Sequence, residues 1–390
     1  MERLINKYSR KLVSQKICEK GKPVFGILDD ITTWNSGGDE VQILDSVMQR
    51  LSINSILFSP AAEPYRSILD YLAEYSTDTN GRIRPDDTET RTFLHDIPVT
   101  QNFSASEILK ALMQRKGIII PGCGIVTYGT VSPEQAFVTY SSICFSSFVK
   151  FMADYYYHAK GIIPMKGDPD PVFKKAVQWY KESLSSTASS PVIKAPFSSS
   201  EDVINSIIET GRLTVESGMV DSFFGNISVR YGDIIYISQT GSSLDELAGC
   251  IDPCPIDNST TNAITASSEL SAHKALYSMT ERKSILHGHP KFSVTLSMLC
   301  DDLSCVNRGQ CHIKCSRGRF IEDVPVVPGE IGTGPDSLSR TVPAAMKGRG
   351  VIVWGHGLFT AGAEDFTDAY RNLLDIEKMC FNNYLSLVER

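Results

Sequence analysis

Two histidines separated by one glycine follow a short apolar run where residues 284–290 read SILHGHP. The apolar run predicts a buried strand, and residues two apart on a strand project from the same face of its sheet. His287 and His289 can therefore bind one metal ion together. A catalytic metal site usually takes three protein ligands and leaves one position open, whereas a structural site closes on four. The candidates to complete the set are Glu269 upstream and His356 downstream.

The charge and the apolar runs of the chain limit what it can bind. A formal net charge of -7 argues against nucleic acid or an anionic membrane surface as a partner, because no basic stripe is available to neutralise phosphates. The longest uncharged runs, residues 117–133 and 135–149, are broken by glycine and proline or rich in serine. Both are shorter than the roughly 20 apolar residues of a membrane helix, so we expect no membrane span.

The N-terminal residues and the cysteines bear on the compartment. No apolar core follows the first charged residues, so the sequence predicts no secretory signal and a cytoplasmic protein. Ten cysteines in a reducing compartment suggest thiols or metal ligands before disulfides. Cys250 and Cys254 form one pair, and four more cysteines crowd into residues 300–315 beside His312. Their spacings match no strong zinc or iron-sulfur template, so a second metal site and ordinary thiols are both open interpretations.

Apolar periodicity predicts helices that alternate with strands along the chain. The predicted helices cover residues 1–20, 41–51, 63–75, 105–115, 133–157, 171–182 and 202–217. The predicted strands cover residues 24–28, 55–58, 97–99, 117–120, 234–238 and 285–286. This alternation predicts an α/β fold, and the length favours two domains. We place the first domain at residues 1–165, a helix with a serine-rich linker at 166–200, and the second domain at 201–390.

Two stretches of the second domain recur in the first domain without a gap. Residues 350–362, GVIVWGHGLFTAG, align with residues 117–129, GIIIPGCGIVTYG, and keep every glycine. Residues 284–290 align in the same way with residues 55–61. Internal similarity of this kind is typical of a repeated structural unit. We therefore predict two copies of one fold.

The metal-binding positions differ between the two predicted copies. Phe58, Pro60 and Cys123 stand where the second copy has its three histidines, and Glu40 aligns with Glu269. Phenylalanine and proline offer no ligand atom, so the first domain is predicted to have lost the metal. One metal ion per chain is the expectation.

The motifs of the second half resemble those of the class II (zinc-dependent) aldolase/adducin family, and of fuculose-phosphate aldolases in particular. They are Gly-Asn-Ile-Ser at residues 225–228, a strand ending in Thr240-Gly241, Ser-Ser-Glu at 267–269 followed by His273 and Tyr277, His-x-His-Pro at 287–290 and Gly-His-Gly at 355–357. The resemblance covers residues 201–390, and the first half shares it only through the repeat. It implies a three-layer α/β/α fold, a mixed central β-sheet flanked by helices, present twice.

The resemblance also implies roles for the four candidate ligands. In that family the histidines that match His287, His289 and His356 bind zinc, and the glutamate that matches Glu269 completes the resting site and acts as acid and base. Mn²⁺, Fe²⁺ or Co²⁺ also suit these ligand types.

A second group of residues matches family positions that hold a substrate phosphate. Glycine turns and helix starts offer backbone N–H donors, to which hydroxyl and amide side chains add hydrogen bonds. The alternative interpretation is that these are only turn and helix-cap residues. They are Gly225, Asn226, Thr240, Gly241, Ser267 and Ser268.

The other histidines carry weaker signals. His273 lies one helical turn beyond Glu269 and is interpreted as a structural hydrogen-bonding residue. His95, His158 and His312 have no partner at a metal-binding spacing and are interpreted as ordinary residues.

The resemblance implies a zinc-dependent lyase that cleaves or forms a carbon-carbon bond in a phosphorylated sugar or a related hydroxycarbonyl compound. A divalent cation would stabilise the enediolate that bond cleavage leaves, and a carboxylate within hydrogen-bond reach would move the proton. The alternatives are a decarboxylase or dehydratase of the same superfamily and a non-catalytic, adducin-like scaffold protein. Family members typically form rings of four, so we expect a homo-oligomer, either a dimer or a tetramer. The identity of the substrate and the role of the first domain stay open.

Overall fold

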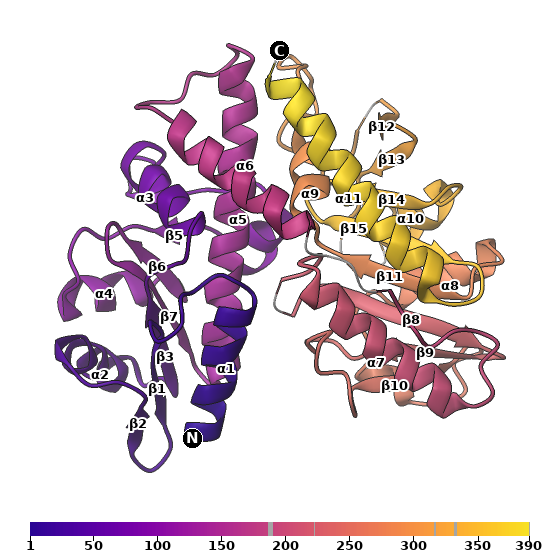
Figure 1. The fold of residues 1–390 in the computed structure, drawn as a ribbon, viewed down its shortest axis with the longest axis horizontal. Coiled ribbons are helices and arrows are strands. Elements are labelled where there is room, and N and C mark those ends of the chain that lie inside the picture. Colours follow the sequence, from indigo (N-terminus) through magenta and orange to yellow (C-terminus); the bar gives the residue numbers. More distant parts are fainter. Residues whose placement is uncertain (186–189, 222, 316, 331–333, 390) are drawn as a thin grey trace. The chain divides into compact units, whose positions relative to one another are not determined.

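The chain divides into two compact units, Met1–Glu182 and Ser183–Arg390, in a computed structural model of the full sequence (Figure 1). The structure describes residues 1–390 except 186–189, 222, 316, 331–333 and 390. The boundary lies after Glu182, inside the segment 166–200 that the sequence assigns to a helix and a linker, and helix α6 (Asp170–Ser185) packs on the first unit. The ring of Phe173 in α6 stacks on Tyr155 with 3.7 Å between ring centroids.

The first unit holds a five-stranded sheet in the order β2-β1-β3-β7-β6, in which every neighbouring pair is antiparallel. Its strands are β1 (Val24–Leu28), β2 (Thr32–Trp34), β3 (Ser55–Ser59), β6 (Gly117–Ile120) and β7 (Gly124–Gly129), and β4 (Arg82–Ile83) and β5 (Ile97–Pro98) form a separate pair. Its helices are α1 (Glu2–Ser14), α2 (Asp39–Leu51), α3 (Tyr65–Tyr75), a π-helical turn (Thr90–Leu94), α4 (Ala105–Leu112), α5 (Pro133–Ala159) and α6.

One helix among the described residues, α5, is long and apolar enough to cross a membrane. Helix α5 continues beyond the uncharged run at residues 135–149. Lys150 and Asp154 lie in this continuation and pair at 2.9 Å. In its most apolar window 83% of the residues are buried, which is the pattern of a core helix.

The second unit holds an eight-stranded sheet in the order β10-β9-β8-β11-β15-β14-β13-β12. All neighbouring pairs are antiparallel except β13 and β14, so the sheet is mixed. Its strands are β8 (Asn226–Tyr231), β9 (Ile234–Ser238), β10 (Ile251–Pro255), β11 (Ser284–Gly288), β12 (Arg319–Ile321), β13 (Val324–Val327), β14 (Gly350–Val353) and β15 (Gly357–Gly362). Its helices are α7 (Ser200–Glu216), a 3-10 turn (Asn262–Ile264), α8 (Leu270–Met279), α9 (Lys291–Met298), α10 (Leu338–Ala345) and α11 (Phe366–Val388). The mixed α/β fold predicted from the sequence is confirmed.

Helices cover both faces of this second sheet. Helices α8 and α10 share one hydrophobic core with Ile285 of β11 and Phe359 of β15. Helix α11 contacts the same strands on the opposite face, where the hydroxyl of Thr360 donates to the carbonyl oxygen of Ala369 at 2.8 Å. Because side chains alternate along a strand, His287 projects to the same face as Ile285, toward α8. This layer between β11 and α8 holds the candidate site.

The central strands of the two units pair in matching order and register. The order β1-β3-β7-β6 in the first unit matches β8-β11-β15-β14 in the second. Ser55 lies opposite Gly129 as Ser284 lies opposite Gly362. A Cβ atom at either glycine would lie 2.0 Å from the carbonyl oxygen three residues further along, so each position requires glycine for the same reason.

Candidate functional site

Three histidine side chains meet inside the second unit. His287 lies near the end of β11, His289 lies just beyond that strand, and His356 lies in the turn between β14 and β15. Their exposed fractions are 0%, 3% and 4%, and each pair of ring centroids is 5.0 Å apart. Among the described histidines, cysteines and acidic residues, they form the one group of three whose ligand atoms all lie within 4.8 Å of one another.

A backbone hydrogen bond sets the orientation of the His287 ring. Nδ1 of His287 lies 3.2 Å from the carbonyl oxygen of Leu358 on the neighbouring strand. A carbonyl oxygen only accepts, so Nδ1 donates the hydrogen and Nε2 keeps its lone pair. Nε2 of His289 lies 3.2 Å from this Nε2 atom. Two imidazole nitrogens directed at one point suit a shared cation.

Burial keeps these imidazoles in the neutral form. It lowers the pKa of His287 from 6.5 to about 3. It also lowers the pKa of His289 well below 6.5, and the neighbouring His287 and His356 add to that shift. Neutral imidazole is the form that binds metals. Three imidazole nitrogen donors beside a carboxylate, with His287 and His289 held neutral, fit the ligand preference of zinc.

The carboxylate of Glu269 completes the group. Glu269 stands at the start of α8 and is 6% exposed. Its Oε1 lies 3.4 Å from Nε2 of His356, and its Oε2 lies 3.7 Å from Nε2 of His287. The amide of Asn226 donates to Oε2 at 2.8 Å. The carboxylate is therefore held beside the three rings, where it can bind a cation or exchange a proton with a bound molecule.

A chain of buried hydrogen bonds holds Asn226 in turn. Nε2 of His273 lies 2.6 Å from Oδ1 of Asn226, and because an amide oxygen only accepts, the ring nitrogen donates. Nδ1 of the same ring then accepts from the hydroxyl of Ser228 at 2.7 Å. Tyr277 donates to the carbonyl oxygen of Ser228 at 3.0 Å. Ser228 belongs to the Gly-Asn-Ile-Ser motif, but the sequence analysis assigned no role to it. It lies two residues beyond Asn226 on the same strand and so on the same face.

His273 should make the stability of the metal-free protein depend on pH. Burial lowers the pKa of His273 from 6.5 to about 3. Below pH 6.5 the unfolded chain therefore binds a proton at this residue, whereas the folded chain binds it only near pH 3. We expect this residue to lower the free energy of unfolding by about 1.4 kcal/mol between pH 7.5 and 5.5. Urea unfolding in the presence of a chelator measures it. His273→Gln should reduce the pH dependence by that amount, and an unchanged dependence would contradict the assignment.

A glycine lets the histidine rings approach one another. A Cβ atom on Gly357 would lie 2.4 Å from the carbonyl oxygen of Gly288, 2.7 Å from Cε1 of His287 and 2.8 Å from Cδ2 of His289. Real Cβ atoms do not approach other atoms this closely, so any larger residue must displace the rings.

We therefore expect Gly357→Ala to weaken metal binding and to lower the free energy of unfolding by about 1–3 kcal/mol. Gly348→Ala is the matched control, because a Cβ atom there meets no atom within 4 Å. Chemical denaturation and metal analysis of both variants measure the effect. Equal behaviour of the two variants would show that the rings are not held at this distance.

The predicted phosphate-binding residues lie together at one end of β8 and β9. The hydroxyl of Thr240 donates to the carbonyl oxygen of Ala266 at 2.9 Å, and the backbone N–H of Ser267 donates to Ser238 at 3.0 Å. These bonds join the turn after β9 to the segment before α8. Side chains of this group already bond within the chain, and so does the backbone N–H of Thr240, which donates to the carbonyl oxygen of Thr265 at 2.9 Å. The group comprises Gly225, Asn226, Thr240, Gly241, Ser267 and Ser268.

Two further features beside His289 were missed by the sequence analysis. Lys291 and Asp221 form a buried ion pair with 2.7 Å between Nζ and Oδ2. The ring of Phe224 stacks on His289 with 5.6 Å between centroids. The residues of the ion pair are 70 positions apart in the sequence, so no spacing signal connects them.

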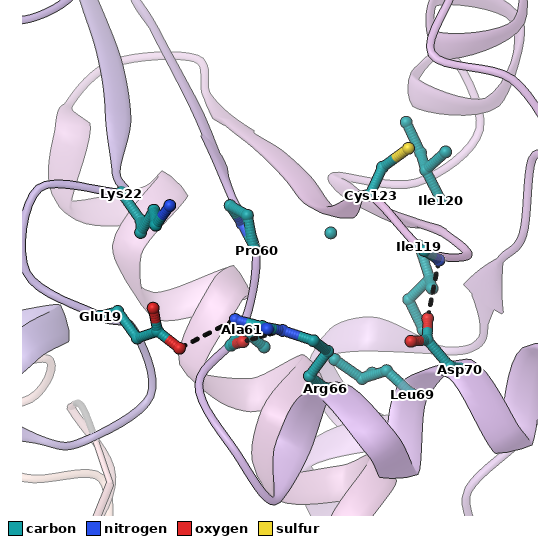
Figure 2. Close-up of a pocket in the computed structure, with 12 residues that line it drawn as sticks. Glu19, Lys22, Pro60, Ala61, Arg66, Leu69, Asp70, Ile119, Ile120 and Cys123 are labelled. Atoms are coloured by element: carbon teal, nitrogen blue, oxygen red, sulfur yellow. Dashed lines mark hydrogen bonds and ion pairs between the residues drawn. The ribbon is translucent and has the colours of Figure 1, made fainter.

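The aligned positions of the first unit have different surroundings. Pro60 and Cys123 line a cavity of about 220 Å³ together with Arg66 (Figure 2). Phe58 packs in the core of the unit instead, and Glu40 is exposed. No group of three metal ligands gathers at this place among the residues that the structure describes.

Comparisons with known proteins concern about half of the chain. Residues 205–384 match the family model of the Class II Aldolase and Adducin N-terminal domain. An L-fuculose phosphate aldolase of Methanococcus maripaludis is 26% identical over 184 residues, which are 47% of this chain and 96% of that protein. Among solved structures, an L-fuculose-1-phosphate aldolase from Thermus thermophilus is 21% identical with a TM-score of 0.36, and the match covers 46% of this chain and 93% of that one. The family model and the sequence relative support the class II aldolase superfamily for this part of the chain.

Proposed function

We propose that the second unit is a divalent-metal-dependent lyase of the class II aldolase type, acting on a phosphorylated sugar or a similar hydroxycarbonyl compound. The observation that carries the proposal is the convergence of three buried imidazoles and one carboxylate at a single place inside the second unit. The family match to residues 205–384 supports it. So does the relative, whose name states that it acts on fuculose phosphate.

In this proposal His287, His289 and His356 hold the ion, and zinc fits them best. A divalent cation there supplies Lewis acidity toward the carbonyl and hydroxyl oxygens of the substrate and stabilises enediolate charge. The hydrogen bond from Nδ1 of His287 to Leu358 fixes which nitrogen of that ring is the ligand. Burial of the rings excludes water and keeps protons from competing for their lone pairs.

Glu269 is the proton-transfer group in this proposal. The amide of Asn226 holds Oε2, so the carboxylate keeps one orientation while Oε1 stays on the side of His356. His273 prevents the amide of Asn226 from rotating, because its Nε2 hydrogen fits only the amide oxygen. The backbone and hydroxyl groups at the end of β9 and before α8 would receive the phosphate.

An aldol-cleavage screen on metal-analysed protein tests the proposed function. Purified protein should contain zinc or another divalent ion at the histidine group and release an aldehyde from at least one sugar phosphate. Turnover should stop with a chelator and return with the metal. Metal-loaded protein that releases carbon dioxide from a hydroxy acid, and no aldehyde, would assign decarboxylation instead. Protein without bound metal would favour the scaffold alternative.

We further propose that the first unit is a copy of the same fold that has lost the metal. The matching strand order and the matched pairs Ser55–Gly129 and Ser284–Gly362 support it. Because Phe58 and Pro60 replace two ligands, one such ion per chain follows. We also propose a homo-oligomer of two or four chains. Light scattering that finds a fully active monomer would contradict this assembly.

A further inference from the structure

Residues 299–318, here called the cysteine loop, connect α9 to β12 without regular secondary structure. None of its described residues beyond Leu299 is buried, and Leu303 and Val306 are 49% and 94% exposed. Irregular loops of this length inside compact domains are uncommon unless they are functional or held by something other than a core. The loop carries four partly exposed cysteines, namely Cys300, Cys305, Cys311 and Cys315.

Hydrogen bonds fold the cysteine loop back on itself. The guanidinium of Arg319 donates to the carbonyl oxygens of Ser297 and Leu299, both at 2.6 Å, and this ties the two ends together. Arg308 donates from its side chain to the carbonyl oxygen of Cys300 at 3.3 Å and from its backbone to that of Cys305 at 3.0 Å. The first cysteines are thereby drawn toward the middle of the loop.

The other three thiols of the cysteine loop lie near that of Cys311. Burial raises the pKa of Cys311, repulsion from Cys315, Cys300 and Cys305 raises it further, and Arg319 lowers it. In the described residues the histidines, and not these sulfur atoms, form the group within 4.8 Å, so the thiols must rotate inward to share a ligand. A cation that binds thiolates would remove the repulsion between these sulfur atoms.

We propose that the four cysteines of this loop hold one structural zinc ion as thiolates. Zinc takes four sulfur ligands in a closed tetrahedral site, and the gaps of four, five and three residues let each ligand come from a separate turn. Four thiols release four protons to solvent on binding, which leaves a complex of charge -2. Arg308 and Lys314 in the loop, and Arg319 directly after it, are cations that can offset that charge. Zinc would replace the missing hydrophobic core.

The cysteine loop also touches the turn that carries His356. The ring of His312 lies 6.1 Å from that of Trp354, and the backbone N–H of Gly329 donates to the carbonyl oxygen of His312 at 2.8 Å. The zinc site would therefore steady one ligand of the histidine group without belonging to it.

Metal analysis of the full-length protein tests this proposal independently of the proposed activity. A Cys305→Ser, Cys311→Ser double variant should lose one zinc ion per chain and keep the ion at the histidines, whereas Cys123→Ser and Cys250→Ser should lose none. Cobalt-substituted protein should show the intense near-ultraviolet absorption of thiolate ligands, and this band should disappear in the double variant but persist in His287→Ala.

Alkylation of the wild-type protein tests the site without any variant. Mass spectrometry should find the four loop cysteines protected in zinc-loaded protein and labelled after chelation. Unprotected cysteines together with an unchanged zinc content in the double variant would overturn the proposal. Iron with labile sulfide at these cysteines, or disulfides between them, would overturn it as well.

Discussion

Replacing Glu269 with glutamine should leave the metal bound and lower kcat by about 10²–10⁴-fold. The three histidines remain as ligands, and the glutamine can still accept the hydrogen bond from Asn226, so the geometry survives. What disappears is the group that takes and returns the proton, and general acid-base catalysis contributes a factor of this size. Steady-state kinetics on the substrate found in the screen, with metal analysis of the same sample, measures both quantities.

The control for this variant is Glu281→Gln, an exposed carboxylate ahead of β11. It should keep full turnover. If Glu269→Gln kept full turnover as well, proton transfer would have to be assigned to another group. If it lost the metal together with its activity, Glu269 would be a required ligand and its catalytic role would stay a separate question.

Replacing His287 with alanine should remove one zinc ion per chain and abolish turnover. The ring of His287 lies 5.0 Å from each of the other two rings, and its Nδ1 bonds to the backbone of β15 at Leu358. Bound zinc at 100 times its dissociation constant stabilises the folded state by about 2.7 kcal/mol, so chelation should destabilise the wild-type protein more than the variant. Inductively coupled plasma mass spectrometry and thermal unfolding, with and without a chelator, measure these effects.

His95→Asn is a suitable control for that variant. His95 is exposed and lies in the first unit, which holds none of the proposed ligands. It should keep the full zinc content. A His287→Ala protein that also kept it would remove the metal assignment, and with it the proposed function.

The histidine group could be predicted because it depends on local geometry. His287 and His289 share a face of one strand by the two-residue period, and His356 stands between two glycines directly after an apolar run. Strands β7 and β15, however, were not predicted, because each begins and ends with glycine, which is typical of turns.

Other features could not be predicted because they depend on contacts between distant residues. The hydrogen bonds between His273 and Asn226 and between Tyr277 and Ser228 connect a helix to a strand. Helix α1 ends at Ser14, short of the predicted residue 20, and Cys18 beyond it makes an isolated bridge to Ala61. Neither kind of contact leaves a periodic pattern in the sequence.

The bond from His287 to the carbonyl oxygen of Leu358 has a consequence for how this chain can change by mutation. In many proteins the outer partner of a histidine ligand is a carboxylate side chain, which a single substitution removes. Here the partner is a peptide group, which every residue at position 358 supplies. Drift at that position alters packing but cannot delete the acceptor. Changes at the histidines themselves, or at Gly357, where a Cβ atom would crowd two of their rings, would disturb the site instead. The aligned positions of the first unit hold Phe58 and Pro60 in place of His287 and His289.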